Sequence, residues 1–219
     1  MCGRTVTGDV DWPQYFAWMN ILGAPSTPIR QSWNVAPTTI NPIFIPSNGG
    51  MAGAMARWGL VPEWWKQPLK ELKFATFNAR SEEAAAKPTF RNAMRHSHCL
   101  VPMKGYYEWK GPKGSKTPYF ISASTNAPGI CVAGLYTEVA LPDFQGYTYT
   151  ILTEASAGAL KALHPRVPVM LDETSYDGWI SGAALKDLPR IDASRIRFHE
   201  VGKAVGKVGN DGPELLLPV

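Results

Sequence analysis

The chain opens with Met1-Cys2-Gly3-Arg4, and Cys2 is the residue with the most distinctive chemistry. Initiator methionine is usually removed when the second residue is as small as cysteine, which would make Cys2 the free N-terminus. Its α-amine and thiol would then lie on adjacent carbons, and an α-amine with a pKa of about 7.7–8.0 is partly neutral and nucleophilic at pH 7. This pair condenses with an aldehyde, first to a Schiff base and then to a thiazolidine. The alternative is that Cys2 is an accident of the start codon.

Two further residues have side chains suited to proton transfer. Glu108 lies in a predicted strand between Tyr107 and Trp109, where an inward-pointing carboxylate would be desolvated. Strand alternation alone favours a surface glutamate there. His164 follows an apolar helical segment and precedes a strand, and an imidazole can gain or lose a proton near neutral pH. A lone histidine is nevertheless more often structural.

The elements that must position these residues are short. Asp11 is a good N-cap for a helix over 12–22, and an apolar face and Gly23 fit its body and its end. Further helices are predicted over 79–86, 156–163 and 173–180, and residues 111–116 read as a hairpin loop. Strands are predicted over 40–45, 51–58, 99–103, 106–110, 117–122, 130–136, 147–153 and 167–171. Strands outnumber helices without regular alternation, which indicates an α+β fold with a curved, mostly antiparallel, barrel-like sheet.

The composition is that of an ordinary globular protein. The 219 residues are 45% hydrophobic and 18% charged, without repeat, linker or low-complexity tract, and we expect a single domain over 1–219. No segment approaches the length of a membrane span, and the N-terminus lacks a signal-peptide layout. Three cysteines do not make a disulfide framework. We therefore expect a cytoplasmic protein that is not bound to membranes.

Positive charge is concentrated in the middle of the sequence. Between Arg57 and Lys116 there are twelve Lys/Arg and five Asp/Glu, a local excess of +7, although the whole chain carries only +4. A basic region rich in aromatic residues suggests a polyanion partner, most commonly nucleic acid. A solvated lysine-rich face is the alternative, and charge alone does not exclude it.

Seven segments, taken in order and spacing, resemble the SRAP (SOS-response-associated peptidase) family over nearly the whole chain, through to Ala204-Val205-Gly206. They are Met1-Cys2-Gly3-Arg4, Trp33-Asn34-Val35-Ala36-Pro37, Trp58-Gly59-Leu60-Val61-Pro62-Glu63-Trp64-Trp65, Phe77-Asn78-Ala79-Arg80-Ser81-Glu82, Gly105-Tyr106-Tyr107-Glu108-Trp109-Lys110, Leu152-Thr153-Glu154-Ala155 and Leu163-His164-Pro165-Arg166-Val167-Pro168. The resemblance implies an α+β domain that senses abasic sites in single-stranded DNA and crosslinks to them through the N-terminal cysteine. It implies catalytic roles for Cys2, Asn78, Glu108 and His164, with Glu108 and His164 assisting sugar ring opening and proton transfer.

The same resemblance points to residues that would contact DNA. Asn78 and Arg80 are one residue apart in an extended segment, so both can reach one groove, and a guanidinium can grip a phosphate with two hydrogen bonds. Arg4 and Arg166 read as flanking phosphate clamps, although an internal salt bridge competes for each arginine. Glu82 is expected to orient Arg80, and Thr153 to hydrogen-bond near the active-site strand. Asn34 is undecided between a site residue and a buried turn.

Trp64 and Trp65 are predicted to lie in a loop. Neighbouring indoles cannot both be core residues on one strand face, so at least one should project and stack on a base beside the lesion. The alternative is that one indole is packed and the other incidental. His96-Ser97-His98-Cys99 lacks the spacing and the partner residues of a zinc site, so we expect no metal, and no nucleotide-binding fingerprint indicates a cofactor.

The chain departs from the family pattern at Thr5, Glu83, Pro165, Val167 and Lys207-Val208-Gly209, which puts DNA contacts in doubt more than chemistry. The expected activity is abasic-site processing of a kind classed as peptidase, hydrolase or lyase within DNA repair and the SOS response. We expect a monomer that associates with the nucleoid when bound to DNA. Two other functions stay open: an N-terminal-nucleophile cysteine (auto)peptidase, and a non-covalent single-stranded DNA-binding module.

Overall fold

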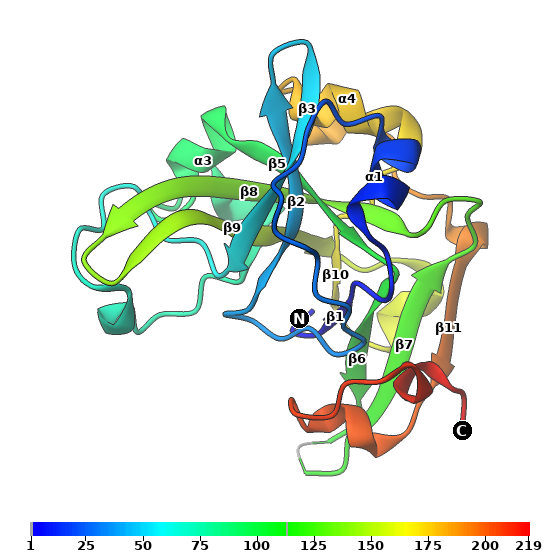
Figure 1. Cartoon of the computed structure of the whole chain (residues 1–219). Coiled ribbons are helices and arrows are strands. Elements are labelled where there is room, and N and C mark those ends of the chain that lie inside the picture. The colour runs from blue at the N-terminus through cyan, green and yellow to red at the C-terminus, as the bar shows by residue number, and fades with distance from the viewer. Residues whose placement is uncertain (1, 113) are drawn as a thin grey trace.

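The computed structural model describes residues 2–112 and 114–219, and its centre is a barrel (Figure 1). In the described chain, five strands close a ring in the order β9, β3, β2, β5, β8 and back to β9. All neighbours are antiparallel except β3 and β9, which are parallel. The five are β2 (Ile40–Ser47), β3 (Gly50–Trp58), β5 (His98–Met103), β8 (Ile130–Leu141) and β9 (Phe144–Ala155). The predicted α+β fold with a mostly antiparallel, barrel-like sheet is confirmed.

Two short strands lengthen the sheet at the carboxyl end of β9. β4 (Asn78–Arg80) pairs with β9 in parallel, and β10 (Arg166–Pro168) pairs with it antiparallel. The predicted helix over 79–86 is therefore wrong at its start, because residues 78–80 are extended and the helix α2 (Ser81–Ala84) follows them. Hydrogen bonds to an open strand edge outweigh the helix propensity of an alanine-rich segment.

A second sheet packs beside the barrel. Its order is β1-β6-β7-β11, antiparallel throughout, with β1 (Thr5–Val6), β6 (Gly105–Lys110), β7 (Thr117–Ala123) and β11 (Ile196–Glu200). The β6–β7 pairing confirms the predicted hairpin around residues 111–116, of which Lys113 lies outside the described residues. β6 and β7 approach very closely at Gly105, where an added Cβ would lie 2.3 Å from the Ile121 carbonyl oxygen.

The helices are short and lie outside the barrel (Figure 1). α1 (Trp12–Met19) begins at Asp11 in a capping box with Gln14, and ends at Asn20 in the left-handed region (φ 48°), three residues before the predicted stop at Gly23. In the described chain no helix is long and apolar enough to cross a membrane. The remaining helices are α3 (Arg91–His96), α4 (Tyr176–Ile180) and the 3-10 turns η1 (Leu69–Glu71), η2 (Gly158–Ala162), η3 (Glu173–Ser175), η4 (Leu185–Asp187), η5 (Ala193–Arg195), η6 (Lys203–Gly206) and η7 (Pro213–Leu216).

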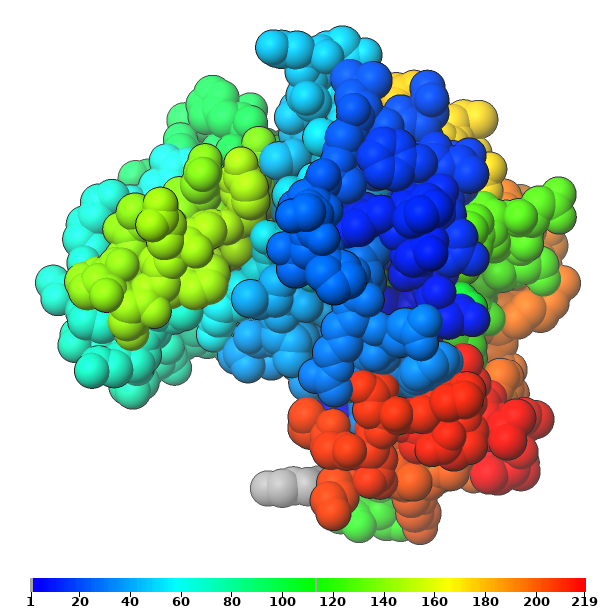
Figure 2. All heavy atoms as spheres, in the orientation of Figure 1, coloured from blue at the N-terminus to red at the C-terminus, as the bar shows by residue number. Residues whose placement is uncertain are grey.

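Strand alternation divides the core into two packed regions. Phe44 and Leu100 share one region with side chains of α1 and α4, whereas their neighbours Ile43 and Val101 share another with the N-terminal segment and β6. A third cluster joins the outer face of β6 to the C-terminal segment. Figure 2 shows that this segment, in red, packs against residues from the blue N-terminal part of the chain. Both faces of β6 are therefore covered by protein.

Candidate active site

The thiol of Cys2 is buried inside the protein. Cys2 has an exposed fraction of 0% and shares its core cluster with aromatic side chains, among them Trp58, Tyr106 and Tyr149. Burial raises the pKa of the Cys2 thiol well above its usual value, and the negative charge of Glu108 raises it further. The sulfur is therefore protonated at neutral pH, so nucleophilic use of it requires a nearby base.

The segment around Cys2 is held by backbone hydrogen bonds on both sides. Thr5 exchanges two bonds with Val35, N to O at 3.0 Å and 2.9 Å, and the Tyr107 N–H donates to the Arg4 carbonyl at 2.9 Å. From the barrel, the Asn78 amide donates through Nδ2 to the Cys2 carbonyl at 2.5 Å. Cys2 is thus fixed between β4 and β6, although it is close to a chain end.

Glu108 faces the same interior space from β6. Its exposed fraction is 4%, so the surface position favoured by strand alternation is wrong. Tyr106 packs in the cluster that contains Cys2, and Tyr107 packs in the one beneath the C-terminal segment. Since side chains two apart share a strand face, Glu108 lies on the Cys2 side.

His164 lies between η2 and β10, as its sequence neighbours predicted. Its Nδ1 is 3.8 Å from Oε1 of Glu108. The backbone of Arg166 offers the same Nδ1 both an acceptor, the carbonyl oxygen at 2.9 Å, and a donor, the N–H at 3.1 Å. The ring can thus carry a proton on Nδ1 or release it without losing a backbone partner. This arrangement suits a group that passes protons to and from a carboxylate.

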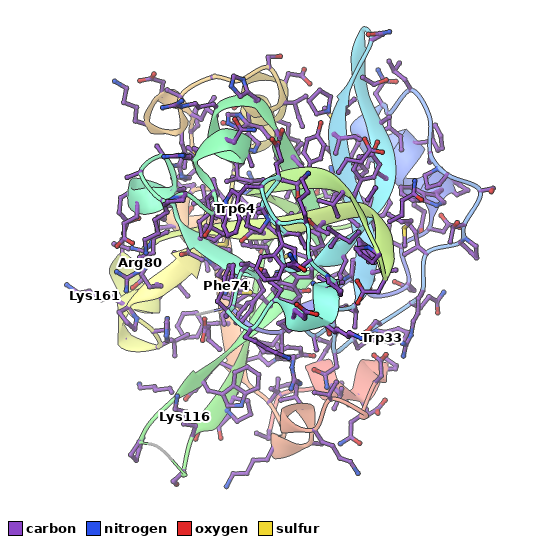
Figure 3. The ribbon with its side chains drawn as sticks, turned by 90° about the vertical axis from the view of Figure 1, so that its left-hand side faces the viewer. Trp33, Trp64, Phe74, Arg80, Lys116 and Lys161 are labelled. Carbon is purple, nitrogen blue, oxygen red and sulfur yellow. The ribbon has the colours of Figure 1, made fainter. Side chains whose placement is uncertain are left out.

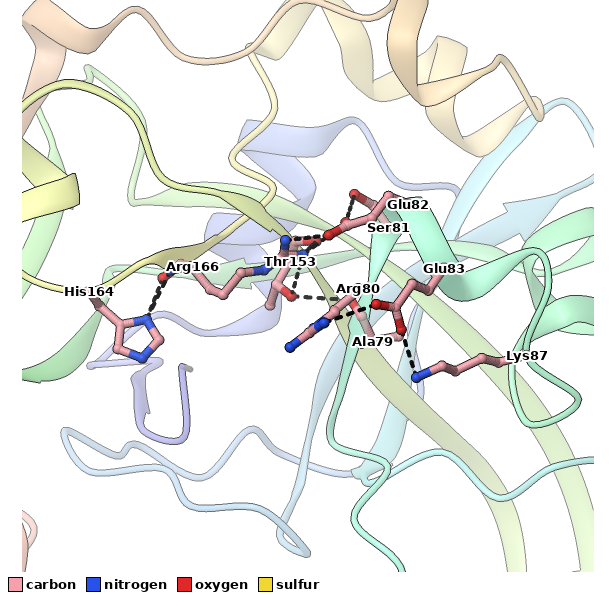
Figure 4. Close-up of polar contacts among 9 residues, drawn as sticks. All are labelled: Ala79, Arg80, Ser81, Glu82, Glu83, Lys87, Thr153, His164 and Arg166. Atoms are coloured by element: carbon pink, nitrogen blue, oxygen red, sulfur yellow. Dashed lines mark hydrogen bonds and ion pairs between the residues drawn. The ribbon is translucent and has the colours of Figure 1, made fainter.

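Asn78 and Arg80 extend from one side of β4, while Ala79 between them is buried. Oδ1 of Asn78 is buried and has no hydrogen-bond partner among the described residues, so it can accept from a bound group. Arg80 is exposed and donates from Nη1 to Oε1 of Glu83 at 2.9 Å, and Figure 4 shows the contact. The expectation that Glu82 orients Arg80 is therefore wrong, because Glu83 does so.

Arg166 is held by Glu82 and Thr153 (Figure 4). The guanidinium grips the Glu82 carboxylate with two nitrogens, one contact being Nη2 to Oε2 at 2.9 Å, and donates to the Thr153 carbonyl at 2.6 Å. Thr153 in turn donates from Oγ1 to the carbonyl of Ala79 at 3.3 Å, which confirms its place beside β4. Hydrogen bonding to Arg166 lowers the pKa of Glu82 to about 2. Arg166 is thus oriented at the junction of β4, β9 and β10.

Arg4 and Asn34 join the N-terminal segment to the C-terminal one. Nη1 of Arg4 donates to Oδ1 of Asn34 and to the carbonyl of Val205, both at 2.9 Å. The Asn34 amide donates to the carbonyls of Val205, Lys207 and Asn210. Asn34, undecided from sequence, therefore fastens the C-terminal segment. A phosphate contact of Arg4 stays a prediction, and it would require the guanidinium to exchange these bonds.

The two adjacent tryptophans differ in exposure. Trp64 is 55% exposed and donates from Nε1 to the Pro88 carbonyl at 3.3 Å, whereas Trp65 is partly buried. The rings of Trp64 and Trp65 meet edge to face at 6.0 Å, and Trp65 meets Phe74 likewise at 6.1 Å. Figure 3 labels Trp64, Phe74 and Arg80 in one view. At least one indole projects, as predicted, and its use in base stacking stays a prediction.

His98, from the segment considered as a zinc site, makes its contacts inside the protein. Its ring stacks on Trp179 with centroids 3.7 Å apart, and its nitrogens lie 2.9 Å and 2.8 Å from the carbonyl oxygens of Trp179 and Met94. Within residues 2–112 and 114–219, no three His, Cys, Asp or Glu side chains are grouped to hold a metal ion.

The family can now be assigned. The family model described as SOS response associated peptidase (SRAP) matches residues 1–208. The chain belongs to the SRAP family. Among curated SRAP relatives, the abasic site processing protein YoqW of Bacillus subtilis is 30% identical over 228 residues, covering 99% of both chains. The abasic site processing protein YMR114C of Saccharomyces cerevisiae is 34% identical over 87% of this chain, which spans only 53% of the yeast protein.

Solved structures support the SRAP fold. A protein from Bordetella bronchiseptica superposes with a TM-score of 0.78 at 22% identity, covering 92% of this chain and all of the other. A protein from Bacteroides thetaiotaomicron gives 0.74 at 20% identity, covering 87% of each chain. At these identities the likeness concerns the fold alone.

Two residues near this SRAP site were missed from sequence. Glu83 was noted only as a departure from the family pattern, yet it is the partner of Arg80. Tyr106 was placed in a predicted strand and a family-like segment without a role of its own, yet it shares the Cys2 cluster and the β6 face of Glu108. The spacing of Tyr106 and Glu108 carried that signal, because residues two apart in a strand face the same way.

Proposed function

We propose that this SRAP chain, once Met1 is removed, captures abasic sites in single-stranded DNA as a thiazolidine on Cys2. The observation that carries the proposal is the position of Cys2: its carbonyl is held by Asn78, and its buried thiol feels the charge of Glu108, which lies 3.8 Å from His164. The relatives named abasic site processing proteins support the substrate class.

The chemistry uses the groups already described. The α-amine of Cys2 attacks the open-chain aldehyde of the abasic sugar, and the carbinolamine loses water to give an imine. The thiol proton passes to Glu108, the sulfur adds to the imine carbon, and the nitrogen takes a proton back. His164, 3.8 Å from Glu108, exchanges protons with it during sugar ring opening and during reversal. The net change is the loss of one water.

Binding of the strand is assigned to exposed groups around this centre. Trp64 offers an exposed ring for an unstacked base, and Arg80 offers a guanidinium for a phosphate. Arg80 and Lys161 project toward the same edge of the molecule in Figure 3. Arg166 offers a second guanidinium, and a phosphate would have to displace Glu82 to bind it. Single strands should therefore be preferred to intact duplex.

Intact-mass analysis of the mature protein mixed with an abasic oligonucleotide tests the proposal. We expect the sum of the two masses less one water, in an adduct that survives denaturation without reductant, because a closed thiazolidine resists hydrolysis. A matched oligonucleotide with a tetrahydrofuran in place of the abasic sugar has no aldehyde and should give no adduct.

Variants at the N-terminus separate this function from its alternatives. Cys2→Ser keeps the amine and should give mainly a labile imine, while Cys2→Ala should bind DNA without a heat-stable adduct. A tag left before Cys2 should abolish the reaction. Equal heat-stable adduct from Cys2→Ala would refute thiazolidine capture, and absence of any adduct from the unsubstituted protein would favour a non-covalent binder or a peptidase.

A further inference from the structure

The Tyr106 hydroxyl is a buried polar group that the chemistry above leaves unused. The side chain is fully buried, and its oxygen has no hydrogen-bond partner among the described residues. The adjacent Tyr107, by contrast, donates to the Trp33 carbonyl at 2.9 Å, and the Tyr149 hydroxyl lies 3.4 Å from the Asn41 amide. Because buried polar groups in proteins are nearly always hydrogen-bonded, this hydroxyl calls for a functional explanation.

The location of Tyr106 indicates which group it serves. It stands two residues before Glu108 on β6, so both side chains face the Cys2 cluster. Burial raises the pKa of the Tyr106 hydroxyl, and a negative charge on Cys2 or on Glu108 raises it further. The hydroxyl therefore keeps its proton at neutral pH. It shares a core cluster with Cys2 and makes no hydrogen bond to the neutral thiol, so it is available as a donor when the sulfur becomes charged.

We propose that Tyr106 is a positioning residue for the Cys2 thiol, donating a hydrogen bond to the sulfur when it becomes charged. The inference rests on the proposed function. The thiol proton moves to Glu108, and Tyr106 stabilises the thiolate without giving up its own proton. The sulfur then forms the C–S bond, the imine π electrons move to nitrogen, and nitrogen takes the proton from Glu108. A donor at this point offsets the burial and the Glu108 charge that oppose thiolate formation.

The test uses Tyr106→Phe, with Tyr107→Phe as the matched control. Both remove one hydroxyl from adjacent positions of β6, but Tyr107 lies on the opposite face and its loss affects only the contact with Trp33. The first measurement is the pH titration of thiolate absorbance in the mature protein, taken as the difference from a Cys2→Ser background. We expect Tyr106→Phe to move the midpoint upward by on the order of one pH unit, and Tyr107→Phe to leave it unchanged.

The second measurement is the rate of adduct formation with abasic single-stranded DNA over pH 6 to 9. Tyr106→Phe should be slower by roughly tenfold throughout this range, because burial holds the pKa of the thiol above it in both proteins and one pKa unit is a tenfold change in thiolate. An unchanged thiolate midpoint in Tyr106→Phe, or an equal shift in both variants, would overturn the inference. Absence of adduct from the unsubstituted protein would overturn the proposed function alone, because the absorbance titration measures the hydrogen bond to sulfur without DNA.

Discussion

The proposed reaction centre, defined as Cys2, Asn78 and Glu108, differs sharply from the rim, defined as Trp64, Arg80 and Glu83. Cys2 and Glu108 are buried and Asn78 is half-buried. Asn78 lies on β4, Glu108 lies on β6, and Cys2 lies in the N-terminal segment that Asn78 holds. Rim charges instead pair across solvent, as Arg80 does with Glu83 at 2.9 Å. This difference predicts that a substitution in the centre changes the rate of bond formation with the abasic site. A substitution on the rim should instead change the salt-dependent affinity for single-stranded DNA.

The strength of polar interactions differs between the interior and the surface of a protein in the same way. Polar interactions in a poorly solvated interior are strong, and an unsatisfied group there is costly. Exposed ion pairs are typically worth only about 0–1 kcal/mol and weaken with salt.

The largest effect is expected for Glu108→Gln. The amide cannot accept the thiol proton, so adduct formation should slow by roughly 10²–10⁴-fold, the range for loss of one acid–base group. Affinity for an abasic-free single strand should not change. Stopped time courses over pH 5 to 8 measure the rate, and a wild-type rate across that range would remove Glu108 from the mechanism.

His164→Ala should have a smaller effect. Glu108 remains, so adduct formation should slow by about tenfold to a hundredfold. Reversal should also slow, because the proton transfers proposed for His164 run in both directions, and the adduct should persist longer. The decay of purified adduct after a chase with excess unlabelled abasic DNA measures this, and faster decay in the variant would contradict the assignment.

Gly105→Ala tests whether β6 holds the centre rigidly. The new Cβ would lie 2.3 Å from the Ile121 carbonyl oxygen and 2.6 Å from the Phe120 ring, so the β6–β7 pair must separate. We expect a loss of about 1–3 kcal/mol in the free energy of unfolding, measured by urea denaturation. Gly209→Ala is the control, because an added Cβ there would have no neighbour within 4 Å and the backbone is not in the left-handed region.

Arg80→Ala should weaken binding to any single strand by a few-fold and reduce the salt slope by roughly 0.7. Abasic and intact strands should be affected alike, because the contact proposed for Arg80 is with a phosphate, which both strands carry. Glu83→Gln should have the opposite effect. It removes the carboxylate that pairs with Arg80, so binding of single-stranded DNA should become slightly tighter. Fluorescence anisotropy at several salt concentrations measures both, and an effect confined to abasic DNA would place Arg80 in the centre instead.

The smallest effect concerns pH and Glu82. Its folded pKa of about 2 lies below the ordinary 4.5, so its stabilising bond to Arg166 is fully present above pH 4.5 and is lost as pH falls through about 2. Glu82→Gln should therefore leave the shape of the adduct-formation profile unchanged between pH 5 and 8. The stability difference from the unsubstituted protein should be constant in that window and narrow only below it. A profile that shifts between pH 5 and 8 would contradict this.

Local pattern was a good guide to strands and to most helices: α1 lies within the predicted 12–22, η2 within 156–163, and η3 with α4 covers 173–180. Most strands of the barrel were predicted within a few residues, because alternation and turn residues act locally. α3 and β11 were missed, since Arg91–His96 and Ile196–Glu200 are largely polar and exposed and are stabilised by their neighbours. The helix predicted over 79–86 was wrong at its start because its partner β9 lies far away in sequence.

The chemistry available at Cys2, the strand around Glu108 and the family pattern that links them could all be read from the amino-acid sequence. Only the tertiary structure decided that Glu108 is buried, that Glu82 pairs with Arg166 and Glu83 with Arg80, and that Tyr106 faces the thiol cluster. The reason is physical: alternation gives a strand two faces, but packing against segments distant in sequence decides what each face meets. On β6 those segments are the N-terminus on one face and the C-terminal turns on the other.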